Sequence, residues 1–394
     1  MKTFYFDNAA TTFPKPAEVY DFMDSFYRTS GANAGRGQYK ISAETSRLIF
    51  ETRELLKDLL FCPNKEVIFT PSATIALNML ILGIAKGWKK TSEHAMTVYV
   101  SPFEHNAVTR SLHSLENAGL AKVKVLSVEK DFSYDFEKIE GQFKNENPDL
   151  LILSHVSNVC GFVCPVEKLC ALAKKYGSLT ILDMAQSALL LPLNVGSDDF
   201  DFAVFAGHKT MMGPLGVGGF VAKASVLLEK VAPVFFGGTG IESANQDMPQ
   251  DLPARFEMGS MNIHAISGLN AALKWWVRDS EVIRKKEKEN HKMLLEILRS
   301  YDFIKIVGVA VEERIEKCTG VVSCLFDGYT ADEIGIVLDK QNIAVRTGLQ
   351  CAPLAHKTLG TFSTGTVRLS TGAFTNDEDF ETLQAALDYI GENL

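Results

Sequence analysis

Short apolar runs alternate with longer amphipathic stretches between residues 67 and 220 of the chain. The apolar runs have the length of strands, and they lie at 67–70, 98–100, 122–128, 150–153, 180–182, 202–206 and 217–220. Stretches of helix length separate them, for example 73–82 and 165–176. Strands that alternate with helices are typical of a mostly parallel sheet with helices on both faces. The pattern therefore predicts an α/β fold.

The two ends of the chain follow a different pattern. A short strand at 4–6 precedes two predicted helices, at 18–27 and 41–61, and the second carries leucines at helical spacing. A charged run at 284–290 is most simply the solvated face of a long helix. After that run, we expect helices to separate three further strands near 305–309, 321–326 and 366–370.

This division predicts two domains. Residues 15–275 would form a large α/β domain, and residues 1–14 with 276–394 would form a smaller α+β domain. A chain of 394 residues with 46% hydrophobic residues is long and apolar enough to bury such cores.

Charge and cysteine content exclude several classes of protein. A formal net charge of −8 gives no basic surface for nucleic acid or for an anionic membrane, so we expect neither partner. The most apolar long segment, 67–85, contains Pro71 and several polar residues, which indicates strand, turn and helix rather than a membrane span. Asp7 follows the start too closely for a secretory signal, and seven irregularly spaced cysteines predict reduced thiols, a cytoplasmic location and no metal site.

Polar side chains follow the predicted strands at the point where each strand ends. They are Ser72, Thr74, His105, Asn158, Asp183, Gln186, His208 and Lys209. Because the carboxyl ends of parallel strands share one edge of a sheet, and ligands of open α/β sheets bind at that edge, we expect these groups to form one site.

Lys209 follows the apolar run 202–206 and precedes a segment rich in glycine. Burial lowers the pKa of a lysine, and the neutral amine is the form that attacks an aldehyde. Asp183 directly follows another apolar run, where an unpaired carboxylate would be costly. A surface lysine in an ordinary turn is the alternative for Lys209 taken alone.

The strand that ends at Thr70 meets a turn, 71–74, and then a helix. Free N–H groups and hydroxyls at a helix N-terminus suit a phosphate, although a simple serine or threonine cap explains the same residues. A lysine, a buried aspartate, a histidine able to stack on a ring and a phosphate turn together meet the needs of pyridoxal 5′-phosphate (PLP). Lys209 would hold the aldehyde, Asp183 would face the ring nitrogen and His105 would stack on the ring.

Several motifs, spread over most of the chain, resemble one family. They are Asp-Asn-Ala-Ala-Thr-Thr at 7–12, Glu-His-Asn-Ala at 104–107, Ser-His-Val-Ser-Asn at 154–158, Gly-His-Lys at 207–209 and Val-Arg-Leu-Ser at 367–370. With these motifs the chain resembles PLP enzymes of fold type I in the class V aminotransferase group, and among them the cysteine desulfurases. The segment Arg-Thr-Gly-Leu-Gln-Cys-Ala-Pro at 346–353 resembles the nucleophile loop of the SufS-like branch, where Arg-x-Gly-x-His-Cys-Ala is usual.

The resemblance implies roles for named residues. Lys209, Cys351 and His105 would be catalytic. The cofactor would be held by Lys209, Asp183, Gln186, His105, Asn158, Ala73, Thr74 and His208, and by Ser260 of the neighbouring subunit of a homodimer. The substrate would be bound by Arg368, which suits a carboxylate as a bidentate fork, and by Arg346, Asn8 and Ala9.

The implied activity is conversion of L-cysteine to L-alanine, with sulfur passing to Cys351 as a persulfide. Delivery would go to an acceptor such as a SufE- or SufU-like protein, for example in iron–sulfur cluster assembly. Selenocysteine lysis, cysteine sulfinate desulfination and another class V activity such as amino transfer stay open as alternatives. A sulfur-carrier or assembly partner with little turnover is the alternative from another class, and Cys351 taken alone could be an inert buried thiol.

Six positions depart from the family pattern. The departures are Gln350 in place of His, Ala206 in place of a hydroxyl residue, Met184 in place of Gly, Ser260-Met261 in place of Thr-Pro, and Tyr39 in place of His. Gln350 would remove a proton carrier beside the nucleophile. The sequence therefore leaves the sulfur acceptor and the rate open.

Overall fold

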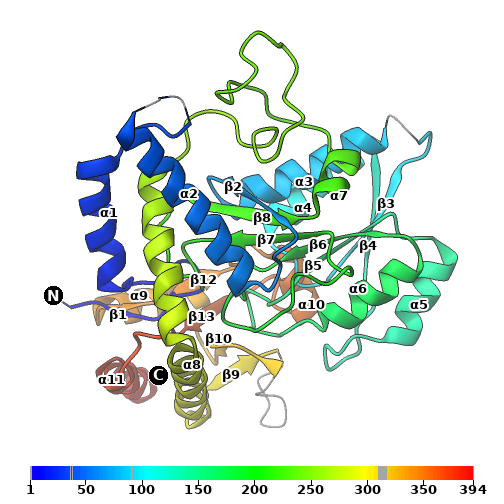
Figure 1. Cartoon of the computed structure of the whole chain (residues 1–394). Helices are drawn as coiled ribbons and strands as arrows, with labels where there is room; N and C mark the ends of the chain where they lie inside the picture. Colours follow the sequence, from blue (N-terminus) through cyan, green and yellow to red (C-terminus); the bar gives the residue numbers. More distant parts are fainter. Residues whose placement is uncertain (1, 36, 38, 90–91, 309–316, 394) are drawn as a thin grey trace.

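A seven-stranded sheet forms the centre of the structure, a computed structural model that describes residues 2–35, 37, 39–89, 92–308 and 317–393 (Figure 1). In spatial order its strands are β2 (Glu66–Thr70), β8 (Gly218–Ala222), β7 (Phe202–Ala206), β6 (Leu179–Asp183), β5 (Leu150–Ser154), β3 (Met96–Val100) and β4 (Ala121–Val125). Within the described residues, β8 alone runs antiparallel to its neighbours, which confirms the predicted parallel sheet.

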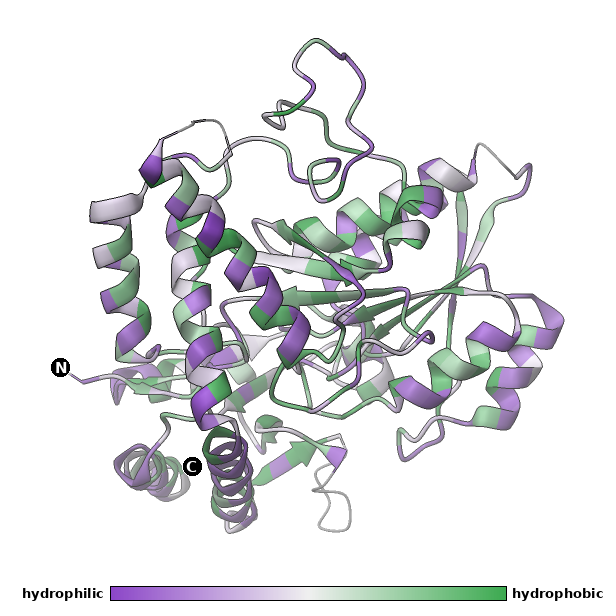
Figure 2. Ribbon diagram, in the orientation of Figure 1, coloured by the Kyte–Doolittle hydropathy of each residue, from purple (hydrophilic) through white to green (hydrophobic). Residues whose placement is uncertain are grey.

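The strands are apolar because both faces of the sheet are covered. On one face lie α3 (Ala73–Trp88), α4 (Asn106–Asn117) and α7 (Ala224–Lys230). The other face packs against α1 (Ala17–Ser30), α2 (Lys40–Leu59), α5 (Phe136–Asn145), α6 (Val166–Lys175) and the first part of α8 (Ile263–Arg299). Figure 2 shows hydrophobic residues along the sheet and hydrophilic residues on the outer sides of the helices.

A second, smaller layer lies beside the large sheet. Its four-stranded antiparallel sheet has the order β12 (Arg346–Gly348), β13 (Thr366–Ser370), β10 (Val321–Phe326) and β9 (Ile304–Val307). The remaining elements of this part are β1 (Phe4–Tyr5), which pairs in parallel with β11 (Ile343–Ala344), and the helices α9 (Ala331–Lys340), α10 (Pro353–Leu359) and α11 (Asp377–Asn393). A separate hydrophobic cluster joins these elements to the end of α8.

The helix α8 connects the two layers. Its 37 residues extend for about 56 Å at 1.5 Å per residue. Trp276 is buried against the large sheet, whereas Leu298 is buried in the smaller layer. The charged run at 284–290 lies in this helix but is not fully solvated, because Asn290 is buried and donates to the carbonyl oxygens of Gly372 and Thr375.

The predicted elements agree with the structure except at some ends. The predicted helix 41–61 ends at Leu59, since Phe61 has a φ of 54° and has left the helical conformation. The strand predicted at 122–128 ends at Val125, and the last residue of the strand predicted at 305–309 lies outside the described residues. The proposed division at residue 275 stays a prediction. Among the described residues, no helix is long and apolar enough to cross a bilayer.

Replacing Leu269 by alanine should destabilise the protein by about 2–5 kcal/mol, because the side chain is fully buried between α8 and the large sheet. The matched control is Val282→Ala on the same helix, whose residue is 69% exposed and whose loss should change stability by less than about 0.5 kcal/mol. Thermal and denaturant unfolding of the three proteins measures both effects. Equal stability of the two variants would contradict the assigned packing.

Candidate active site

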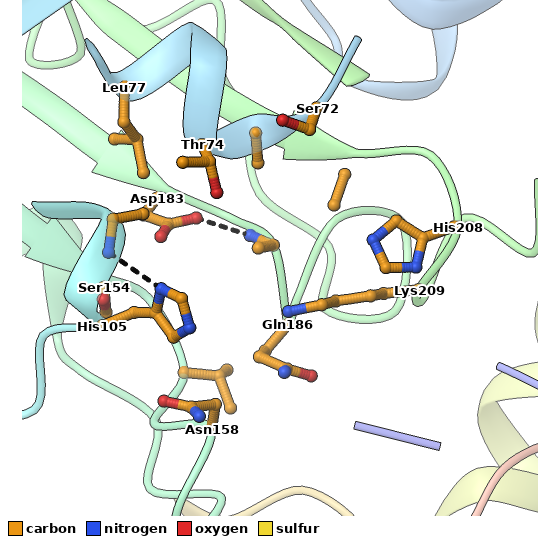
Figure 3. Close-up of a pocket in the computed structure, with 15 residues that line it drawn as sticks. Ser72, Thr74, Leu77, His105, Ser154, Asn158, Asp183, Gln186, His208 and Lys209 are labelled. Carbon is orange, nitrogen blue, oxygen red and sulfur yellow. Dashed lines mark hydrogen bonds between the residues drawn. The ribbon is translucent and has the colours of Figure 1, made fainter. Parts of the chain in front are cut away.

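The carboxyl ends of β5, β6 and β7 meet at one edge of the large sheet and bring the predicted side chains together (Figure 3). Ser154 at the end of β5 lies opposite Asp183 at the end of β6, and Asp183 lies opposite Val204 of β7. A cavity at this edge is lined by nine of the predicted site residues: Ser72, Ala73, Thr74, His105, Asn158, Asp183, Gln186, His208 and Lys209.

Lys209 and Asp183 are the two charged groups that line this cavity. Lys209 is half-buried at the cavity, and burial lowers its pKa to about 8, although the Asp183 carboxylate opposes the shift. Burial also raises the pKa of Asp183, opposed by the N–H of Ala185, which donates to Oδ1 at 2.9 Å, and by the charge of Lys209. Burial and the opposite charge therefore act against each other on the pKa of Asp183 and on that of Lys209.

His105 caps the N-terminus of α4. Its Nδ1 accepts a hydrogen bond from the N–H of Ala107 at 3.0 Å, so the ring proton of the neutral form is on Nε2. Burial lowers the pKa of His105 to about 4, and the charges of Lys209 and Arg346 act in the same direction. A neutral ring facing the cavity suits stacking on a flat ligand (Figure 3).

The turn before α3 has the geometry of an anion site. Ser72 caps α3, accepting from the N–H of Ile75 at 3.3 Å through its hydroxyl and from Ala76 at 3.1 Å through its carbonyl. The N–H groups of Ala73 and Thr74 belong to the same first turn and have no acceptor within the helix. A Cβ atom on Gly218 would lie 2.8 Å from the nitrogen of Ala73, so glycine at that position lets β8 approach the turn. The serine cap and a phosphate site are therefore compatible.

Three further polar residues line the cavity with part of their hydrogen-bonding capacity used. Gln186 donates one N–H to the carbonyl oxygen of Ala9 at 2.7 Å, which leaves its second N–H. His208 has a buried Nδ1 without a partner, and burial lowers the pKa of this ring to about 4. Asn158 donates through Nδ2 to the carbonyl oxygen of Gln350 at 2.8 Å.

Arg368 of β13 lies next to this group but does not line the cavity. One terminal nitrogen donates to the carbonyl oxygen of Asn158 at 2.9 Å, and the other pairs with the carboxylate of Asp7. Its Nε is buried without a partner, and the side chain is 1% exposed. Burial lowers the pKa of the guanidinium, with Asp7 acting in the opposite direction.

Cys351 lies between β12 and α10 and is the one cysteine of the seven that is exposed, since the others are buried or half-buried. Its carbonyl oxygen accepts from the N–H of Asn106 at 2.8 Å, which joins its loop to the start of α4 beside His105. Arg346 approaches the Sγ of Cys351 to 3.2 Å through a terminal nitrogen. The alternative of a buried thiol at Cys351 is wrong, because this cysteine is exposed.

Three predicted residues have other surroundings. The side-chain amide of Asn8 bonds to the carbonyl oxygens of Tyr5 and Ser370 and to the N–H of Phe13, so its polar atoms are engaged in the fold. Ala9 reaches the site through its carbonyl oxygen. Ser260 is exposed and lines a separate depression with Pro71 and Phe235, so its reach into another subunit stays a prediction.

The family model of class-V aminotransferases matches residues 4–383. The chain belongs to the class-V aminotransferase family. A probable cysteine desulfurase of Aeropyrum pernix is 32% identical over 98% of this chain and 94% of the relative. Another from Pyrococcus abyssi is 30% identical over 100% of this chain and 96% of its own length.

Solved structures agree with this membership. The apo structure of a cysteine desulfurase from Thermococcus onnurineus matches with a TM-score of 0.90 at 28% identity, covering 100% of this chain and 95% of that one. The cysteine desulfurase CsdA of Escherichia coli, in an S-sulfonic acid form, matches with a TM-score of 0.85 at 26% identity and the same coverage. These matches confirm the predicted fold class, whereas the SufS-like branch stays a prediction.

Two acidic residues of this class-V chain were missed as site residues. Glu104 is fully buried and accepts from the hydroxyl of Ser101 and from the N–H and hydroxyl of Ser154, and burial raises its pKa to about 7. Glu104 thereby joins the segment that carries His105 to the end of β5. Asp7 holds Arg368. The position of Glu104 directly before His105 could have indicated its place in the site. No local sequence pattern indicates that Asp7 pairs with Arg368.

We expect the capture of PLP by cofactor-free protein to speed up with pH with a midpoint near pH 8, because the pKa of Lys209 is lowered from 10.5 to about 8. Asp183→Asn should move this midpoint to lower pH, since the carboxylate favours the charged lysine. Stopped-flow absorbance measures the rates, and Lys209→Ala should give no borohydride-reducible adduct. A wild-type midpoint near 10.5 would contradict the burial of this amine.

Proposed function

We propose that this protein is a PLP-dependent cysteine desulfurase that converts L-cysteine to L-alanine and takes the sulfur onto Cys351. The observation that supports the proposal most strongly is that a lysine–aspartate pair and an exposed cysteine lie at the same edge of the large sheet. A lysine and an aspartate of shifted pKa lie in the cavity, and an exposed cysteine is held to the same edge through Asn106 and Asn158. The full-length similarity to proteins named cysteine desulfurase supports the same reading.

The residues of the cavity fit PLP by their chemistry. Lys209 offers an amine for the aldehyde, Asp183 a carboxylate for the ring nitrogen, and His105 a neutral ring for stacking. The first turn of α3 offers N–H groups for the phosphate, and the second N–H of Gln186 suits a phenolic oxygen. When bound, the cofactor supplies an aldehyde that bonds to amines and a ring that withdraws electrons from the substrate's Cα.

Lys209 and Asp183 divide the proton work between them. With a pKa of about 8, the Lys209 amine is partly neutral near neutral pH, so it can remove the Cα proton of the substrate and return a proton later. The negative carboxylate of Asp183 would stabilise a positive charge on the ring nitrogen of the cofactor. His105, with a pKa of about 4, stays neutral and adds no charge to repel Lys209.

Cys351 supplies the nucleophile. Its thiolate Sγ attacks the sulfur of the substrate, so an S–S bond forms on the protein while the Cβ–S bond breaks and its electrons stay with the substrate carbon. A proton then converts that carbon to the methyl group of alanine. Exposure of Cys351 lets a partner protein collect the sulfur afterwards, and the Arg346 guanidinium at 3.2 Å supplies positive charge beside the sulfur.

Arg368 is the candidate group for the substrate carboxylate. Its unpaired Nε is a donor that the surrounding protein leaves unused, and one terminal nitrogen donates to the carbonyl oxygen of Asn158, a residue that lines the cavity. A homodimer with Ser260 at the partner's cofactor, a cytoplasmic location and a SufE- or SufU-like acceptor belong to the same proposal. The exposed Phe235, which lines the same depression as Ser260, and its exposed neighbour Phe236 offer an apolar surface for such a dimer.

Replacing Cys351 by alanine should abolish formation of alanine and sulfide from L-cysteine in the presence of a reductant, because no protein thiol then attacks the substrate sulfur. The cofactor's absorbance should remain, since Cys351 does not line the cavity. The matched control is Cys318→Ala, a partly exposed cysteine that packs against the hydrophobic cluster of the large sheet, and this variant should keep full activity. If Cys351→Ala converts L-cysteine at the wild-type rate, sulfur does not pass through Cys351. Selenocysteine, sulfinate or amino-transfer chemistry would then be favoured.

Arg368→Lys should raise the KM for L-cysteine about tenfold, because lysine keeps the positive charge but lacks the Nε–H that we assign to the substrate carboxylate. The exposed Arg278→Lys is the control and should leave KM unchanged. Steady-state kinetics at saturating cofactor measures both values. An unchanged KM in Arg368→Lys would move the carboxylate site elsewhere.

A further inference from the structure

Gln350, the residue before Cys351, has its side chain buried and directed away from solvent. Its residue is 2% exposed, whereas Cys351 is exposed. The two residues have positive φ angles, 41° and 58°, a backbone region that side chains with a Cβ disfavour. Such a conformation persists only where the surrounding contacts impose it. The nucleophile loop therefore needs an anchor.

The anchor is a buried hydrogen-bond network around the Gln350 amide. The amide oxygen Oε1 lies 2.8 Å from Nε2 of His356 and accepts from the hydroxyl of Thr366 at 3.2 Å. The amide nitrogen Nε2 donates to the carbonyl oxygen of Thr366 at 3.0 Å. His356 is fully buried, and its Nδ1 lies 2.8 Å from the hydroxyl of Thr361.

This network requires an amide at position 350. The oxygen end of the Gln350 side chain accepts from His356 while the nitrogen end donates to the carbonyl oxygen of Thr366, and a carboxylate cannot supply that donor. Burial lowers the pKa of His356, so its ring is neutral and donates from Nε2 to Gln350. The predicted loss of a proton carrier at Gln350 is therefore a gain of a structural contact: the side chain faces His356 and not the thiol.

The backbone of the same loop is held from the opposite side. Asn158 donates to the carbonyl oxygen of Gln350 at 2.8 Å, and Asn106 donates to that of Cys351 at 2.8 Å. Both asparagines belong to the cavity edge of the large sheet. The side chain of Gln350 thus fixes the loop to β13 and α10, while its backbone is fixed to the cavity.

We propose that Gln350 and His356 form a positioning pair that holds Cys351 in its left-handed backbone conformation beside Arg346. The pair touches neither substrate nor cofactor and acts through the backbone of the loop. The proposal rests on the proposed role of Cys351 as the sulfur acceptor. It makes the placement of the thiol, rather than the cavity chemistry, depend on residues of the smaller layer.

The test uses Gln350→Met, which keeps the volume and removes both polar ends, and His356→Leu. We expect kcat for L-cysteine to fall about tenfold in each with KM nearly unchanged, because a misplaced thiol weakens the transition state and not substrate binding. Cleavage of cysteine sulfinate, which needs no protein thiol, should stay at the wild-type rate. His356→Gln, whose amide reaches as far as Nε2 and donates, should restore kcat for L-cysteine.

A second readout is independent of turnover. In cofactor-free protein, amide hydrogen exchange in the peptide 346–353 should be about tenfold faster in Gln350→Met and His356→Leu, while peptides of α8 keep the wild-type rate. Unchanged exchange in this peptide, or equal losses on L-cysteine and cysteine sulfinate, would overturn the positioning pair. If wild-type protein does not convert L-cysteine, the proposed function fails, and hydrogen exchange still decides whether the pair holds the loop. Should Gln350→Met fail to fold, His356→Leu and His356→Gln carry both readouts.

Discussion

Asp183 and Lys209 place opposite charges at the ends of neighbouring parallel strands, inside protein, and the site depends on the balance between them. Burial favours the neutral form of each group, whereas each charge favours the charged form of the other. The apolar strands β6 and β7 supply the burial, and the N–H of Ala185 supplies the hydrogen bond that keeps Asp183 satisfied. Without the pairing of β6 with β7, neither group would have its partner.

The smaller layer contributes the reactive sulfur and the carboxylate-binding candidate to the same edge. Asn158 is one of the residues that join the two layers, because its carbonyl oxygen accepts from Arg368 and its amide donates to Gln350. A displacement of the smaller layer would therefore move Arg368 and the Cys351 loop together. The long helix α8, buried in both layers, opposes such a displacement.

The sequence predicted the sheet and most of the cavity, because residues that follow parallel strands must meet at one edge whatever the details of packing. It did not predict contacts between distant segments. Asp7 and Arg368 are 361 positions apart, and no local pattern pairs them. Gln350 was expected beside the thiol, since a motif gives the order of residues but not the direction of a side chain at a positive φ angle. Glu104 was missed because Ser154, which donates two hydrogen bonds to its carboxylate, lies on another strand.

Charge balance explains why two arginines lie near one cysteine. Arg368 is already neutralised by Asp7, so a substrate carboxylate arriving at its Nε adds a negative charge that this pair cannot offset. Arg346 has no carboxylate partner in the described part of the chain, and its charge reaches Lys209, His105 and Arg368. It can therefore offset the substrate carboxylate or the negative sulfur as each develops. Arg346 therefore keeps this edge of the large sheet near neutrality, both when the substrate carboxylate arrives and when the sulfur of Cys351 is negative.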